Sequence, residues 1–344
     1  MLGKILDLFR PPRQNQRAAA LPTPLRSMSD LDALLEMTGF GSAALFARRL
    51  ARPCFHLLPD GEQTDIPTGC SRLGGLPDLA SGAHWPTASD GKPLTFYGQI
   101  NLDDVAGDAD SSPLPSSGLL SIFAGPTGSY DEAILAQALL TPPGTTLQAG
   151  TPDNAAAFAD RSDCCFKPVR VRCEAGISLP TENHAFVRSL EVAAPSGDID
   201  ALLEGLAAAP DKALGQLLGY AQFQMADVHS TVYFDAIGRT NQERLLIWES
   251  WDDWEEAKKM QSRLRNGDTY RPWSASDDEN VRWILANRAA IAAGIAQWHA
   301  VLWISSNPLM NLWINDADPI YFLAMTDDSG SVDLTSLRAG ATQS

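Results

Sequence analysis

Residues 71–86 hold a dense cluster of turn-forming residues, in the sequence SRLGGLPDLASGAHWP. The two adjacent glycines permit backbone conformations that other residues avoid, and the two prolines fix the dihedral φ. Such clusters mark turns far more often than ligand cradles, so we expect this segment to steer the chain, with Trp85 packing the turn against a sheet. Arg72 stands just before the turn, where it would meet a carboxylate or phosphate in a cleft, or form an ordinary ion pair.

Alternating apolar and polar residues predict several strands. In residues 94–102, LTFYGQINL, the apolar side chains fall on one face and Gln99 on the other, which is typical of a half-buried strand. The apolar run 119–125 predicts an antiparallel neighbour. A third strand is expected at 217–225, LLGYAQFQM, where Gln222 again stands near the middle of an aromatic-rich pattern. The match between the first and third strands indicates a degenerate internal repeat.

Helical spacing occurs near both ends of the chain. Residues 29–50 predict a helix with Ser29 as its N-cap, and residues 252–267 and 276–300 predict two more. Strand patterns return between positions 298 and 328. We therefore predict the α+β class, with mixed or mostly antiparallel sheets that contain an internal pseudo-repeat and are edged by helices.

One large domain is expected. Residues 1–28 predict a lead-in, with a short amphipathic helix followed by a Pro-rich linker. Residues 29–335 follow as a single domain with a helical insertion at about 249–297, and residues 336–344 are expected to form a disordered tail. The apolar run near the N-terminus is interrupted by charge, and no stretch of about 18 apolar residues occurs, which disfavours secretion and membrane spanning.

Charge and cysteine spacing exclude several function classes. The chain has 42 acidic and 26 basic residues, for a net charge of −16, which disfavours nucleic-acid binding and favours any basic partner. An odd number of cysteines without regular spacing predicts reduced, metal-free thiols in the cytoplasm, and neither a metal nor a cofactor is expected. The cysteines are Cys54, Cys70, Cys164, Cys165 and Cys173.

Five blocks of sequence carry a resemblance to a known family. They are SRLGGLPDLASGAHWP, GKPLTFYGQINLDDV, SSGLLSIF, LLGYAQFQ and NLWINDADPIYFLA, in this order between about residues 70 and 328. Together they resemble the successive signatures of the YwqG-like family of bacterial proteins, a domain of unknown function. The resemblance implies a shared fold and does not imply a reaction.

Two classes of function remain open, because the chain contains no GxSxG, P-loop, HExxH or EF-hand motif. The first is a non-enzymatic protein-binding role. YwqG-like proteins are similar in this respect to small bacterial proteins of toxin and immunity neighbourhoods, so the resemblance implies, as an expectation, an immunity or antitoxin-like protein that neutralises a partner toxin. Aromatic residues of the helical insertion are the expected anchors for the partner, namely Trp251, Trp254 and Trp283.

The second class is an enzyme or small-ligand receptor. Its cleft would lie between the two half-repeats, and its candidate residues are Arg72, Trp85, Gln99 and Gln222. No catalytic residue is predicted in either class, and the sequence leaves the oligomeric state open.

Overall fold

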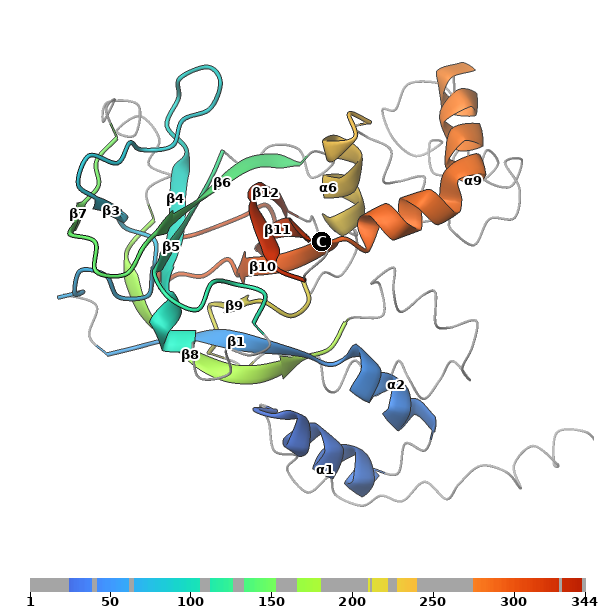
Figure 1. Ribbon diagram of the computed structural model, residues 1–344, viewed down its shortest axis with the longest axis horizontal. Helices are drawn as coiled ribbons and strands as arrows, with labels where there is room; N and C mark the ends of the chain where they lie inside the picture. The colour runs from blue at the N-terminus through green and yellow to red at the C-terminus, as the bar shows by residue number, and fades with distance from the viewer. Residues whose placement is uncertain are drawn as a thin grey trace, which may run out of the picture.

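The protein folds around a closed barrel of antiparallel strands. The computed structural model describes residues 25–38, 42–61, 65–105, 112–125, 133–152, 166–180, 210, 212–221, 228–239, 275–327 and 330–341. The barrel strands are β1 (Arg52–Pro59), β2 (Arg72–Leu73), β4 (Thr95–Asn101), β5 (Leu119–Ala124), β6 (Ile134–Thr141), β8 (Val169–Ser178), β9 (Gly215–Leu217), β10 (Trp298–Ile304), β11 (Ile320–Thr326) and β12 (Val332–Ala341). Around the barrel their order is β1-β8-β2-β4-β5-β6-β12-β11-β10-β9 (Figure 1). A separate small sheet pairs β3 (Asp78–Ala80) with β7 (Leu147–Ala149).

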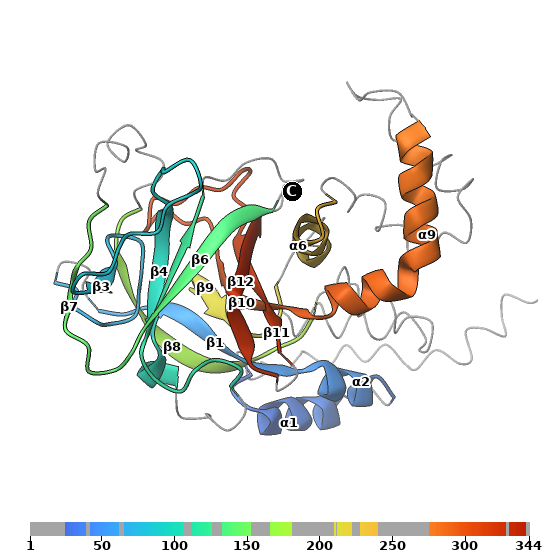
Figure 2. The ribbon, with the colours of Figure 1, turned by 45° about the horizontal axis from the view of Figure 1, so that its top comes forward.

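The fold is predominantly β, so the prediction of an α+β fold with sheets edged by helices is wrong. The sequence patterns do predict strands, but these strands close into one barrel, which removes the open edges that an ordinary sheet would expose. The described helices are α1 (Met28–Thr38), α2 (Ser42–Leu50), α6 (Val228–Ala236) and α9 (Ala275–Ile295). All of them lie outside the barrel, and α9 runs away from it (Figure 2).

The barrel interior is filled with apolar side chains rather than open. Tyr97 lies near its centre. The centroid of its ring lies 5.2 Å from that of Phe166 and 5.3 Å from that of Phe322. Aliphatic residues from all ten barrel strands surround these rings, including Leu73 of β2 and Leu217 of β9. Burial of this much apolar surface is the main force that holds the ten strands together.

The outer surface of the barrel is covered in two places. Outside β4 and β5, Phe96 and Phe123 pack with Trp85 and with Leu79 of β3, so β4 is buried on both faces and not half-buried as predicted. Outside β10 and β11, residues such as Tyr321 pack against α6. The covered strands consequently pack against apolar side chains on both their inner and their outer faces.

The helices differ from the predicted ones at their boundaries. Residues 29–50 belong to two helices, α1 and α2, and the N-cap of α1 is Ser27 rather than Ser29. The Ser27 hydroxyl accepts the Asp30 N–H (3.2 Å), and the Asp30 carboxylate accepts the Ser27 N–H (2.9 Å), which forms a capping box. No helix among the described residues is long and apolar enough to cross a membrane.

The strand order repeats one arrangement twice around the barrel. The meander β4-β5-β6 continues through the short strand β2 to β8, and the meander β10-β11-β12 continues through the short strand β9 to β1. The two long strands β8 and β1 pair with each other where the halves meet. Each half therefore has five strands, and the N-terminal strand β1 completes the second half.

The hydrogen bonds of the two halves match in detail. After β2, the Gly74 N–H donates to the Tyr97 carbonyl (2.9 Å), and after β9, the Leu218 N–H donates to the Val301 carbonyl (2.9 Å). Both acceptors stand at the irregular point of their strand, in β4 and in β10. Gly74 and Leu218 both have positive φ, 67° and 61°, which is rare for a leucine. This register makes β4 the counterpart of β10.

The predicted repeat therefore joined the wrong segments. It matched the strand of Gln99 with that of Gln222, whereas the register gives the place of β4 to β10 in the second half. The described strand near that segment, β9, ends at Leu217, and Gln222 lies outside the described residues. At the other end of the chain, β12 continues to Ala341, beyond the predicted domain boundary at residue 335.

Candidate functional site

One mouth of the barrel contains a cavity of about 350 Å³. It opens where β1 and β10 begin, where β11 ends, and beside the turn that follows β9. The residues that line it are Arg52, Pro53, Phe55, Ser112, Pro113, Leu218, Gly219, His299, Ala300, Thr326 and Gly330. We call this space the mouth cavity. Its size lies within the range of small-molecule sites.

Arg52 supplies the positive charge of the mouth cavity. Its Nη1 lies 2.9 Å from Nδ1 of His299, and its guanidinium carbon lies 4.4 Å from the centroid of the Tyr220 ring. The Tyr220 hydroxyl donates to the Leu50 carbonyl (2.7 Å), and this bond fixes the ring beneath the cation. The guanidinium is thus held by a hydrogen bond on one edge and by a cation–π contact on one face.

His299 is a neutral partner for Arg52. Burial lowers the pKa of His299 to about 4, and the charges of Arg52 and His229 act in the same direction. Because a guanidinium can only donate, Nδ1 of His299 accepts, and the ring proton of the neutral imidazole then resides on Nε2. His299 consequently adds a hydrogen-bond donor to the site and no charge at neutral pH.

Among the described residues, no nearby acid balances the positive charge of Arg52. Within the described part of the chain, no carboxylate oxygen lies within the 4.0 Å limit of an ion pair with this guanidinium. The described lining contains no aspartate, glutamate or lysine either. A partly buried cation without a counterion is uncommon, because desolvation of the charge is costly unless another group compensates it.

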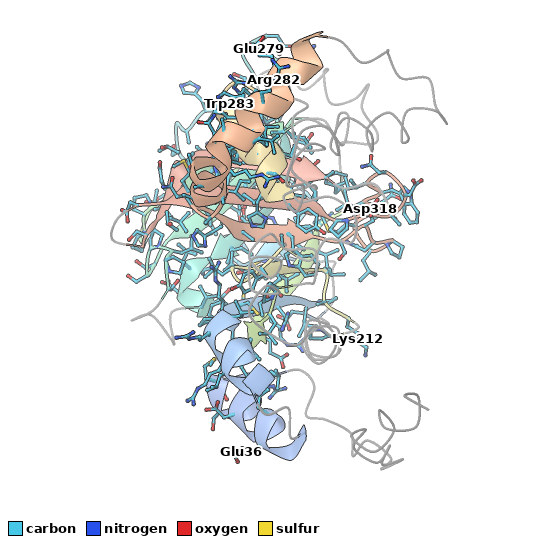
Figure 3. The ribbon with its side chains drawn as sticks, turned by 90° about the vertical axis from the view of Figure 1, so that its right-hand side faces the viewer. Glu36, Lys212, Glu279, Arg282, Trp283 and Asp318 are labelled. Atoms are coloured by element: carbon cyan, nitrogen blue, oxygen red, sulfur yellow. The ribbon has the colours of Figure 1, made fainter. Side chains whose placement is uncertain are left out.

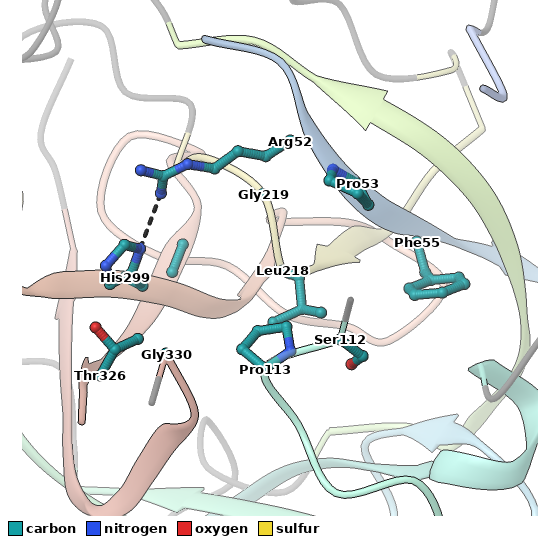
Figure 4. Close-up of a pocket in the computed structure, with 11 residues that line it drawn as sticks. Arg52, Pro53, Phe55, Ser112, Pro113, Leu218, Gly219, His299, Thr326 and Gly330 are labelled. Carbon is teal, nitrogen blue, oxygen red and sulfur yellow. Dashed lines mark hydrogen bonds between the residues drawn. The ribbon is translucent and has the colours of Figure 1, made fainter. Parts of the chain in front are cut away.

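Polar and apolar residues occupy different sides of the mouth cavity. Figure 4 shows Arg52, His299 and Thr326 on one side, and Leu218, Pro113 and Phe55 on the other, with Ser112 beside Pro113 as the one polar residue labelled there. A molecule that fills this space would meet hydrogen-bond donors at one end and apolar surface at the other. The lining is therefore suited to an amphipathic small molecule.

The opposite mouth of the barrel is filled at the equivalent place. Arg52 stands three residues before Phe55, which pairs with Leu217, and Phe166 stands three residues before Val169, which pairs with Leu73. Phe166 is buried against Tyr97. The next residue, Lys167, donates its N–H to the carbonyl of Met310 (2.7 Å), which joins this mouth to the loop between β10 and β11. An aromatic plug thus stands where the other half of the barrel has Arg52.

Two of the predicted cleft residues, Arg72 and Gln99, do meet in space, but inside a buried polar network. Arg72 donates to Asp78 (2.9 Å) and to the Leu76 carbonyl, and Gln99 donates to the same Asp78 oxygen (2.8 Å). The Gln99 carbonyl oxygen accepts the Asp78 N–H (2.8 Å). Because these groups satisfy one another, the network holds the turn between β2 and β3 and does not line the mouth cavity.

Trp85 packs against the sheet, as expected for a residue that fixes the path of the turn. Its indole N–H donates to the Leu94 carbonyl (2.8 Å), and its ring centroid lies 5.4 Å from that of Phe123 in an edge-on arrangement. The side chain is buried at the outer face of β4 and β5, away from the mouth cavity. Gln222, the remaining predicted cleft residue, lies outside the described residues.

The predicted partner anchors are only partly described. Trp251 and Trp254 lie outside the described residues. Trp283 lies on α9, near Glu279 and Arg282 and far from Glu36 of α1 (Figure 3). Its ring is half-buried, and the guanidinium carbon of Arg239 lies 3.8 Å from its centroid. In this structure Trp283 therefore helps to pack α9 near α6.

Sequence reasoning missed Arg52 and His299. The two residues are separated by 247 positions, so no local motif joins them. One signal was present, because His299 is a polar residue within the apolar strand pattern WHAVLWI. A lone histidine in such a strand is more often a packed core residue than a site residue, and only its contact with Arg52 changes that reading.

A scan against family models matches one part of the chain. The model described as a domain of unknown function, DUF1963, matches residues 71–139. This segment includes Arg72, Asp78 and Gln99 of the buried network, but not Arg52 or His299. No curated protein matches the chain. The segment from β2 into β6, without β8, is thus similar to a family whose function is unassigned.

Proposed function

We propose that the protein binds a small molecule with an apolar body in the mouth cavity, as a receptor or carrier. The observation that supports this most is the contrast between the two mouths. At one mouth the buried Phe166 stands at the equivalent place, and at the other Arg52 stands there beside a cavity lined largely by apolar residues. A cavity that is kept open where its counterpart is filled favours a ligand as the missing occupant.

Binding fits this site better than catalysis. The mouth cavity includes the hydroxyls of Ser112 and Thr326, but the described lining contains no carboxylate or thiol. His299, with a pKa of about 4, is a weak base at neutral pH. General-base catalysis is most effective when the pKa of the base lies near the working pH.

Two further proposals rest on sequence. We propose that the chain is a bacterial, cytoplasmic protein of the YwqG-like family, on the strength of its five blocks, of which the first three fall within the matched residues 71–139. The immunity or antitoxin-like role with a basic protein partner stays a prediction. No described contact of Trp283 leads to such a partner.

The proposal is tested with 1-octanol and octanoate as probes, in isothermal titration calorimetry of the full chain. We expect saturable one-to-one binding of at least one probe, accompanied by a higher unfolding temperature. Thr326→Trp should abolish this binding by filling the cavity. Thr87→Trp, at an exposed position outside the cavity, serves as the matched control. Failure of both probes to bind, or equal binding by the Thr326→Trp variant, would overturn the proposal.

A further inference from the structure

The mouth cavity contains a local positive charge in a strongly negative protein. The chain has a net charge of −16, and its overall field therefore attracts cations and repels anions. Several described arginines are neutralised by acids, such as Arg72 by Asp78 and Arg170 by Asp60. Arg52 is paired instead with neutral His299, so the cavity keeps the charge of this guanidinium available.

The guanidinium of Arg52 has donors to spare. It carries five N–H groups, of which the contact with His299 uses one. Tyr220 lies against one face of the guanidinium, 4.4 Å from the guanidinium carbon to the ring centroid. The planar arrangement of the remaining donors matches the two oxygens of a carboxylate, which an arginine binds through two parallel hydrogen bonds.

We propose that the ligand of the mouth cavity is an amphipathic carboxylate, with its carboxylate on Arg52 and its apolar tail against Leu218 and Phe55. This inference rests on the proposed function and names the ligand class. The charge of the described lining is a single guanidinium, which matches one negative charge and not the two of a phosphate monoester. The Nε2–H of His299 supplies a neutral donor beside the arginine.

The experiment compares four probes that share one tail: octanoate, 1-octanol, octyl phosphate and octyltrimethylammonium. Calorimetric titration of the full chain at pH 7 should show octanoate as the tightest ligand, at least tenfold tighter than 1-octanol. The negative field of the whole protein favours the cationic probe, octyltrimethylammonium, over octanoate. A preference for octanoate must therefore arise at the site itself.

The outcomes separate this inference from the proposed function. Equal affinities for octanoate and 1-octanol would overturn the carboxylate assignment and leave the proposed function intact. Tighter binding of octyl phosphate or of octyltrimethylammonium would also overturn the assignment. If no probe binds saturably, both proposals fail.

Substitutions at Arg52 test the charge directly. Arg52→Met keeps an unbranched side chain over Tyr220 and removes the cation, so the preference for octanoate over 1-octanol should disappear. Arg52→Lys keeps the charge without the planar donors and should retain part of the preference, which covers the case in which Arg52→Met fails to fold. Arg172→Met, on the exposed surface of β8, is the matched control and should bind octanoate as the unchanged chain does. An undiminished preference for octanoate in a folded Arg52→Met protein would overturn the inference.

Discussion

Nη1 of Arg52 lies 2.9 Å from Nδ1 of His299, so that the cation of β1 and the imidazole of β10 hold each other across the mouth of the barrel. The contact requires His299 to be neutral, since a protonated imidazole would place two donors and two positive charges together. The pairing therefore links the protonation of His299 to the stability of the barrel.

We expect stability to fall on the acid side through His299. Its pKa is about 4 in the folded protein and 6.5 in the unfolded chain, so between these values the unfolded chain binds more protons. The free energy of unfolding should thus be highest above pH 6.5 and decrease progressively as the pH falls to about 4. Urea unfolding at several pH values between 4 and 7.5 measures this slope. His299→Gln should reduce the slope, whereas His84→Gln, at an exposed site, should leave it unchanged.

The buried network around Asp78 should contribute strongly to stability. Asp78→Ala leaves the Arg72 guanidinium and the Gly69 N–H without their acceptor in a buried site, and we expect a loss of about 3–5 kcal/mol in the free energy of unfolding. Asp60→Ala breaks a more exposed pair with Arg170 and should cost less than about 1 kcal/mol. Urea unfolding measures the free energy of unfolding of both variants. Equal losses in the two variants would contradict the central role of Asp78.

Gly74 should be intolerant of a side chain. It has a φ of 67°, and an added Cβ would collide with the Lys167 carbonyl oxygen, which is backbone and cannot easily yield. Gly74→Ala is expected to cost more than about 2 kcal/mol, because the collision adds to the usual penalty of about 1–2 kcal/mol for this conformation. Gly82→Ala is the control, since Gly82 has a φ of 82° but no atom within 4 Å of the added carbon. Equal losses of stability in the two variants would show that the collision is relieved.

The hydroxyl of Tyr220 should stabilise the link between α2 and the barrel. Tyr220→Phe removes its hydrogen bond to the Leu50 carbonyl in a buried region, at an expected cost of about 1–2 kcal/mol. Tyr233→Phe, on α6, removes a hydroxyl that makes no hydrogen bond in the structure as described, and it should change stability little. Thermal unfolding of the two variants compares these effects. An unchanged unfolding temperature for Tyr220→Phe would mean that water replaces the lost bond.

Local patterns predicted the strands but not their closure into a barrel. Residues 94–102 have an alternating pattern and residues 119–125 form an apolar run, and these segments become β4 and β5. Closure depends on distant pairings, such as Phe55 with Ala175 and with Leu217, which no local pattern reports. Helical segments were prominent in the sequence, and this prominence favoured an α+β fold over the barrel.

No residue of the mouth cavity was predicted from the sequence, for a similar reason, and the predicted cleft residues Arg72 and Gln99 belong to the buried network instead. Arg72 and Gln99 do meet, because Arg72 of β2 pairs with Gln99 of β4, and these two strands lie close together in the sequence. Asp78, the acceptor that joins them, was not identified, since aspartates are plentiful and most are solvated. Arg52 carries no local signal, and His299 carries only that of a polar residue in an apolar strand, until the strands bring the two ends of the chain together.

The position of β1 has a consequence for how the protein is made. This strand leaves the ribosome before every other barrel strand, yet its partners β8 and β9 are completed only at residues 178 and 217. Pairings so distant in sequence slow folding, and an unpaired strand is prone to join a wrong neighbour. The first strand of the nascent chain must therefore stay unpaired while the first half of the barrel is synthesised. Only then can it pair with β8, and later with β9.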